Sequence, residues 1–85
     1  MKYIFVDESW EDYLYWQSTD KKMLAKINAL LKEISINPFS GIGKPEPLKF
    51  KYKGYWSRKI DGEHRLIYKV QGDEILIAKC RFHYD

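Results

Sequence analysis

The chain has 85 residues, of which 45% are hydrophobic, 16% aromatic and 32% charged, and its net charge is +3. A domain this small buries only about 60–65% of the surface of its unfolded chain, which leaves little room for a deep enclosed pocket. We therefore expect any active site in a surface groove or on a sheet face. Its single cysteine, Cys80, excludes an internal disulfide framework and suits a reducing cytosol. The N-terminal apolar run is too short for a signal peptide or a membrane span, so we expect a cytoplasmic protein without membrane contact.

The first half of the chain predicts one strand and two helices. Residues 2–6 form an apolar run rich in aromatic and β-branched residues and predict a buried strand. Ser9, followed three residues later by Asp12, predicts the N-cap of a first helix. Asp20 predicts the N-cap of a second helix, which the Asn-Pro pair at 37–38 ends, and the short connection predicts an antiparallel hairpin. The second helix carries one apolar stripe of Met23, Leu24, Ile27, Leu30, Leu31 and Ile34.

The second half of the chain predicts a sheet. Residues 39–47 contain two glycines and two prolines and predict an irregular loop. The hydrophobic period then changes to 2, which predicts strands at 48–53, 55–60, 63–70 and 74–84. We therefore expect an α+β fold with one domain over residues 1–85, in which an N-terminal strand and a two-helix hairpin pack on one face of a mainly antiparallel, twisted β-sheet.

The register of the predicted hairpins decides which side chains share a face. The Asp61-Gly62 pair predicts a two-residue turn that places Arg58 directly opposite Arg65. Two opposed cations are tolerated more readily when an anion lies between them, although both can instead splay into solvent. A three-residue loop at 71–73 pairs apolar with apolar side chains in the next hairpin. The face under the helices then carries Leu66, Tyr68, Leu76, Ala78, Cys80 and Phe82. The opposite face carries Arg58, Arg65, Lys79, Arg81 and His83, with Trp56, Glu63, Ile67, Ile75 and Ile77.

The two histidines are expected to differ in role. His83 lies on the predicted cationic face, and histidine is the side chain best suited to proton transfer near neutral pH, although a solvated surface residue is the alternative. His64 shares the parity of Leu66 and Tyr68, and we expect it to be structural. The sequence has no HExxH or CxxC motif, so we expect no metal site.

Several motifs resemble those of one protein family. GKPEPLK (43–49), GYWSRKI (54–60), EHRLIY (63–68) and AKCRFHY (78–84), preceded by ESWEDYLYW (8–16) and TDKKMLAKIN (19–28), resemble the YoeB toxins of the RelE/ParE superfamily over nearly the whole chain. The resemblance implies a RelE-like fold and a type II toxin that cleaves mRNA in the A site of the 70S ribosome, on its small subunit. It also implies neutralisation by a YefM-type antitoxin, and action without a cofactor or metal. A homodimer is compatible with this family.

The family's functional residues can be carried over one by one. Its general base falls on Glu46, its general acid on His83, its main phosphate-stabilising arginine on Arg65 and its C-terminal tyrosine on Tyr84. Asp85 extends the chain beyond that tyrosine. The expected RNA- and phosphate-binding residues are Lys49, Arg58, Lys59 and Arg81. Lys59 stands where the family usually has an arginine, so that contact loses its bidentate fork.

The reaction expected is attack of a ribose 2′-hydroxyl on the adjacent phosphate, which yields a 2′,3′-cyclic phosphate. The main alternative is a non-enzymatic toxin of the same fold that blocks a protein target such as gyrase. That alternative accounts for the fold and the basic face but leaves the Glu46, Arg65 and His83 set without a use. A nucleic-acid-binding module without toxicity is a third possibility.

Overall fold

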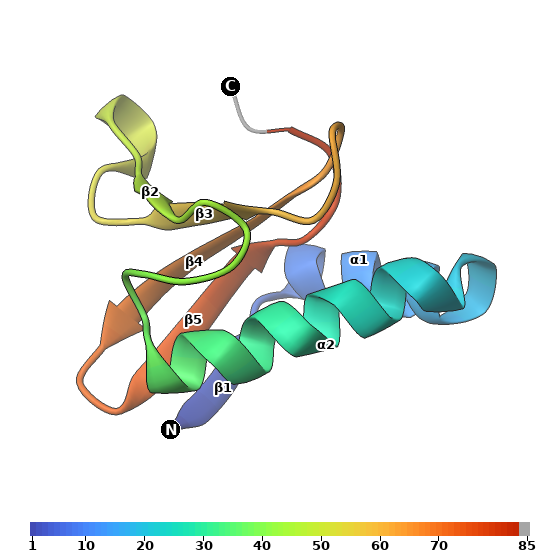
Figure 1. The fold of residues 1–85 in the computed structure, drawn as a ribbon, viewed down its shortest axis with the longest axis horizontal. Helices are drawn as coiled ribbons and strands as arrows, with labels where there is room; N and C mark the ends of the chain where they lie inside the picture. The colour runs from blue at the N-terminus through green and yellow to red at the C-terminus, as the bar shows by residue number, and fades with distance from the viewer. Residues whose placement is uncertain (84–85) are drawn as a thin grey trace.

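The computed structural model describes residues 1–83 and has two helices on one face of a five-stranded sheet (Figure 1). Strand order is β1-β5-β4-β3-β2, with β1 parallel to β5 and the other neighbours antiparallel. This arrangement confirms the expected α+β class. The elements are β1 (Lys2–Phe5), α1 (Asp7–Thr19), α2 (Lys21–Ile36), β2 (Glu46–Pro47), the 3₁₀ helix η1 (Phe50–Tyr52), β3 (Trp56–Lys59), β4 (Arg65–Gln71) and β5 (Glu74–Lys79). Within the described part of the chain, no helix is both long and apolar enough to cross a membrane.

The second helix forms as its sequence predicts. The Asp20 carboxylate accepts hydrogen bonds from the backbone N–H groups of Lys22 (3.1 Å) and Met23 (3.2 Å), which would otherwise lack partners at a helix start. The apolar stripe packs on the sheet through Met23, Ile27, Leu30, Leu31 and Ile34, all of which are buried. Its burial against the sheet fixes which face of the sheet is interior.

Ser9 is not the N-cap of the first helix, contrary to the prediction. Helix α1 begins at Asp7, where two acidic residues in the first turn interact favourably with the helix dipole. Ser9 is fully buried inside the helix, and its hydroxyl donates to the Ile77 carbonyl at 2.6 Å. The residue therefore fastens α1 to β5.

The turn between β3 and β4 is longer than the predicted two-residue turn. The Asp61 carboxylate accepts from the backbone N–H groups of Glu63 (2.8 Å) and His64 (2.7 Å), so the side chain builds the turn itself. These two bonds lower the pKa of Asp61, although burial acts to raise it. Arg58 consequently pairs with Leu66, and Lys59 pairs with Arg65. The one-residue shift moves Arg58 to the helix-covered face.

The turn between β4 and β5 also differs from the prediction. Gln71 pairs with Glu74, which leaves a two-residue turn in place of three residues. Ile75 and Ile77 are therefore fully buried under the helices, and Leu76 and Ala78 are only half-buried on the other side. A β-bulge at Ile67/Tyr68 then restores the original parity, so Cys80 lies in the core with Leu66 and Tyr68 as predicted.

The segment predicted as a strand at 48–53 contains the 3₁₀ helix η1 instead, and the short strand β2 lies just before it. Glu46, expected in an irregular loop, pairs with Ser57 in the sheet. Phe50 has a φ of +57°, a left-handed conformation that cannot continue a strand. The last predicted strand ends at Lys79 rather than at 84. Glu46 is thus placed by the sheet and not by a free loop.

Candidate active site

A cavity of about 320 Å³ opens on the sheet face that points away from the helices. It brings together four of the predicted site residues, Glu46, Lys59, Arg65 and His83, from β2, β3, β4 and the segment after β5. Lys44 and Ser57 complete the lining. Neither residue was predicted as part of the site, although Lys44 belongs to the GKPEPLK motif and Ser57 to GYWSRKI. The site is open to solvent and carries a carboxylate, an imidazole and three cations.

Glu46 is held against β3 by backbone contacts on both sides of it. The Lys59 N–H donates to the Gly43 carbonyl at 2.7 Å, and the Leu48 N–H donates to the Tyr55 carbonyl at 2.9 Å. Gly43 has a φ of +80°, and a β-carbon there would lie 2.9 Å from the Leu30 side chain, so only glycine fits this approach. The strand that carries Glu46 therefore has a fixed position over the cavity.

Arg58, predicted to bind phosphate, is a fully buried residue of the interior, and that prediction is wrong. The register shift places its guanidinium on the helix side, where it forms an ion pair with Glu33 at 3.3 Å and donates to the Tyr68 hydroxyl at 3.2 Å. It also donates to the backbone carbonyls of Asn37, Ser40 and Ile42. Arg58 thus anchors the loop that leads from α2 to Glu46.

Tyr68 supports the same loop from β4. Burial raises the pKa of the Tyr68 phenol, which keeps the hydroxyl protonated, and it donates to the Pro38 carbonyl at 2.6 Å. Glu33 accepts from the Ile42 N–H at 2.8 Å. Arg58, Glu33 and Tyr68 therefore all have hydrogen-bond partners, as the burial of a charge requires.

Arg65 is the central cation of the cavity. One of its terminal nitrogens donates to the carbonyls of Asp61 (2.9 Å) and His64 (3.1 Å), which fixes the plane of the guanidinium. Lys59 lies directly opposite on β3. The predicted opposition of two cations therefore exists, with Lys59 in the place assigned to Arg58. An anion between them would relieve their repulsion.

His83 reaches the cavity because the preceding residue is clamped from both sides. The Phe82 N–H donates to Nδ1 of His64 at 2.7 Å, and the Arg65 N–H donates to the Phe82 carbonyl at 3.0 Å. His64 itself is buried with its ring 4.8 Å from that of Trp16, which confirms its structural assignment. Phe82, predicted under the helices, is half-exposed with a φ of +64°, because the chain turns there.

The other predicted site residues lie apart from this cavity. Lys49 lines a neighbouring groove that shares Glu46 with the cavity. The Arg81 guanidinium lies over the ring of Tyr15, 3.5 Å from its centroid, beside α1. Lys79 pairs with Glu8 at 3.6 Å, so the predicted cationic face is smaller than expected. Tyr84 and Asp85 lie outside the described residues.

The arrangement suits acid–base chemistry on a phosphate ester. Glu46 supplies a carboxylate, His83 supplies an imidazole, and Arg65 with Lys59 supplies positive charge beside both. Among residues 1–83, no three His, Cys, Asp or Glu side chains gather in a way that could hold a metal ion.

Comparison with known proteins places the chain in one family. Residues 5–84 match the family described as YoeB-like toxin of bacterial type II toxin-antitoxin system. Toxin YoeB of Escherichia coli strain K12 is 58% identical over 84 residues, which cover 99% of this chain and 100% of that protein. Toxin YoeB of Synechocystis is 56% identical, with 99% of this chain and 98% of that protein covered.

Solved structures agree with this match. The YoeB/ParE toxin from Agrobacterium tumefaciens superposes with a TM-score of 0.96 at 49% identity, covering 99% of this chain and 100% of that one. In a heterotetrameric YoeB-YefM complex from Staphylococcus aureus, the matching chain has a TM-score of 0.92 at 50% identity, with 99% and 98% covered. YafQ from E. coli strain BL21(DE3), at 22% identity with a TM-score of 0.78 and 96% and 92% of the two chains covered, shares the fold. The chain therefore belongs to the YoeB-like toxins of bacterial type II toxin–antitoxin systems.

Proposed function

We propose that this toxin is a ribosome-dependent endoribonuclease that cleaves mRNA in the A site without a metal. The observation that carries the proposal is the convergence of Glu46, Arg65 and His83, far apart in sequence, on one open cavity. A carboxylate and an imidazole beside two opposed cations match what cleavage of a phosphodiester by its own ribose requires.

In the proposed reaction, Glu46 takes the proton of the 2′-hydroxyl as its oxygen forms a bond to the adjacent phosphorus. The bond from phosphorus to the 5′-oxygen breaks, and His83 gives a proton to that leaving oxygen. The products are a 2′,3′-cyclic phosphate and a 5′-hydroxyl. Arg65 and Lys59 stabilise the negative charge on the non-bridging oxygens, and we assign Tyr84, which lies outside the described residues, a catalytic role on the family resemblance alone. One acid or base supplies about 10²–10⁴-fold, so the pair accounts for a large part of the acceleration.

We propose that the ribosome is required because the cavity is open to solvent. A surface site on an 85-residue chain cannot enclose an RNA strand and hold it in an attack geometry. Fixing the reacting atoms can lower the barrier by roughly 7–11 kcal/mol, and the rigid mRNA path of the small ribosomal subunit can provide that fixation. The remaining partners are proposed from relatives. Solved YoeB proteins from S. aureus form a dimer and a complex with YefM, and we assign this chain a YefM-type antitoxin, homodimer formation and a cytoplasmic location.

The test is single-turnover cleavage of one mRNA, free and loaded on ribosomes with an empty A site, with both new ends mapped. We expect fast cleavage only on the ribosome, and a loss of at least ~10²-fold for His83→Ala. Arg65→Ala should reduce cleavage with a small effect on folding. Lys32→Ala, which removes an exposed cation on α2, is the matched control and should cleave normally. The same assay with Arg81→Ala decides whether that residue contacts RNA.

Two results would contradict the proposal. Equal rates on free and ribosome-bound mRNA would show that the site is complete alone. Intact mRNA together with inhibited DNA supercoiling by gyrase would establish the non-enzymatic alternative.

A further inference from the structure

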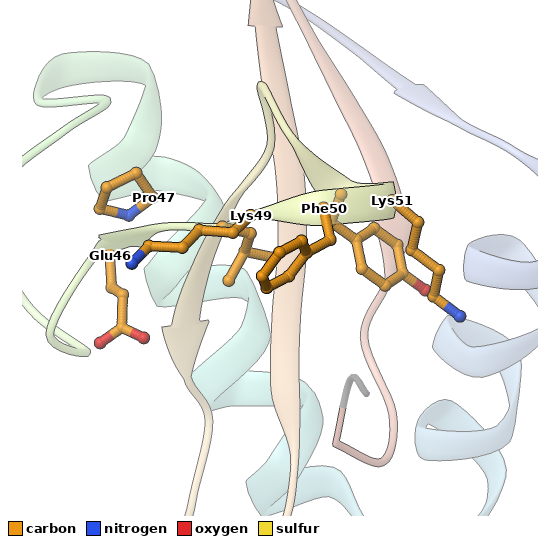
Figure 2. A pocket seen from close by; sticks show the side chains of 7 residues that line it. Glu46, Pro47, Lys49, Phe50 and Lys51 are labelled. Atoms are coloured by element: carbon orange, nitrogen blue, oxygen red, sulfur yellow. The ribbon is translucent and has the colours of Figure 1, made fainter.

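A second hollow lies beside the candidate active site and shares Glu46 with it. It has a volume of about 520 Å³, larger than that of the cavity itself, and is formed by a single stretch of chain. We name it the η1 groove, and its lining is Glu46, Pro47, Leu48, Lys49, Phe50, Lys51 and Tyr52 (Figure 2). Because Glu46 borders both hollows, a strand of RNA leaving the scissile phosphate can pass directly into the groove.

Phe50 is the unusual residue of the η1 groove. Its side chain is 91% exposed, the highest value among the large exposed hydrophobic residues of the described chain. Its φ of +57° is a left-handed conformation that bulky side chains rarely adopt. Exposure and strain both cost folding free energy, and such strain concentrates at ligand-binding positions. The Phe50 ring is therefore exposed to solvent even though both the exposure and the backbone conformation are unfavourable for folding.

The side chains around the ring are cationic. Lysines alternate with aromatic residues in Lys49-Phe50-Lys51-Tyr52, and the Lys51 ammonium lies 5.4 Å from the centroid of the Tyr52 ring. Figure 2 shows the Phe50 ring between the two lysines, with Lys49 extending toward Glu46 and Lys51 extending the other way. An exposed ring between ammonium groups matches a base between two phosphates.

We propose that the η1 groove binds the RNA nucleotide next to the scissile bond, with its base stacked on Phe50. This inference rests on the proposed function and adds to it a substrate subsite. Lys49 and Lys51 bind the phosphates on either side of that nucleotide. A phenyl ring offers stacking but no hydrogen bond, so the subsite accepts any base and favours purines, which stack over a larger area.

The charge of the groove favours RNA over a protein partner. Lysine is depleted at protein–protein interfaces, whereas this ring is bordered by two lysine ammonium groups that the core of such an interface would have to desolvate. The cations Lys59 and Arg65 continue the positive charge on the other side of Glu46. RNA is the ligand that satisfies both the ring and its cationic border.

The experiment combines protein variants with abasic mRNA in the single-turnover ribosome assay. Phe50→Ala should lower cleavage roughly 5- to 150-fold, the usual effect of losing one base–aromatic stack, and Phe50→Trp should restore it. An abasic nucleotide at the stacked position should slow the wild type by a similar factor and leave Phe50→Ala unaffected. Phe39→Ala, which truncates a half-exposed phenylalanine outside the groove, is the matched control and should cleave normally.

Several results would overturn the subsite. One is a normal cleavage rate for Phe50→Ala. Another is a further drop in the cleavage rate of Phe50→Ala on the abasic mRNA, by the same factor as for the wild type. Weakened antitoxin binding or a changed oligomeric state in Phe50→Ala, with cleavage unchanged, would assign the groove to a protein. If the wild type itself cleaves no RNA, the proposed function fails first. Equal affinity of wild type and Phe50→Ala for a single-stranded oligoribonucleotide then overturns the subsite as well.

Discussion

Replacement of Arg58 by methionine tests whether a buried cation holds the loop that carries Glu46. The variant keeps an unbranched apolar stem but removes donors to five acceptors, among them the Glu33 carboxylate 3.3 Å away. Glu33 is left partly buried without its cation, a situation that costs about 3–5 kcal/mol. A chain of 85 residues has a free energy of unfolding of roughly 4–13 kcal/mol, so Arg58→Met removes a large share of it.

Urea unfolding followed by circular dichroism measures this loss. With a slope of about 1–3 kcal/mol per M, a loss of about 3–5 kcal/mol lowers the midpoint by roughly 1–5 M. Arg58→Lys should lie between the two because it keeps the charge but loses the planar fork. Lys59→Met is the control, since the next residue on the same strand points to the exposed face, and its midpoint should barely move. Equal midpoints for Arg58→Met and Lys59→Met would refute the anchoring role.

Three other residues give sharp expectations. His64→Leu leaves the partly buried Phe82 N–H without an acceptor and should cost about 1–3 kcal/mol and misplace His83, whereas His64→Asn retains an acceptor and should cleave faster than His64→Leu. Burial raises the pKa of Asp12 above its ordinary value, so the folded state holds this proton more tightly and the associated stability is lost as pH rises through the raised pKa. Asp12→Asn should therefore raise the urea midpoint at pH 7 and lose that gain at pH 3, and an equal gain at both pH values would contradict this. Burial raises the pKa of the Cys80 thiol to about 12, so native protein should react with a disulfide reagent at least about 10³-fold more slowly than protein in urea; fast native labelling would show local opening around β5.

The features that follow from local pattern were predictable from the sequence. The α2 stripe and its Asp20 cap depend on residues within the helix, and both are confirmed. The structural role of His64 follows from strand alternation, because His64 directly precedes β4 and shares the parity of Leu66 and Tyr68. The convergence of Glu46 and His83 was predicted from the family resemblance and not from spacing, because β3 and β4 separate β2 from β5 in the sheet.

The features that failed depend on competition between turn geometries. Asp61-Gly62 favours a two-residue turn locally, but the Asp61 side chain instead caps two backbone N–H groups of a longer one. The β-bulge at Ile67/Tyr68 is an equally nonlocal feature, because it compensates for a turn that is one residue shorter than predicted. A change of one residue in the turn length reverses the face of every side chain on the following strand. A small error in the predicted turn therefore gave a large error in the predicted position of Arg58.

Arg58 and Lys59 are neighbours on β3 and were both predicted to bind phosphate, but only Lys59 lines the cavity. Strand alternation sends Arg58 inward, where its rigid fork can bond several carbonyls at once, and Lys59 outward to the cavity. The loop that Arg58 anchors leads into β2, which carries Glu46. Loss of the Arg58 guanidinium should therefore lower both the stability of the fold and the rate of cleavage. Loss of Lys59 removes only a positive charge from the cavity where we propose that the phosphate binds, and it should lower cleavage without lowering stability. The two phenotypes separate the residue that shapes the site from the residue that acts in it, although both are cations on one strand.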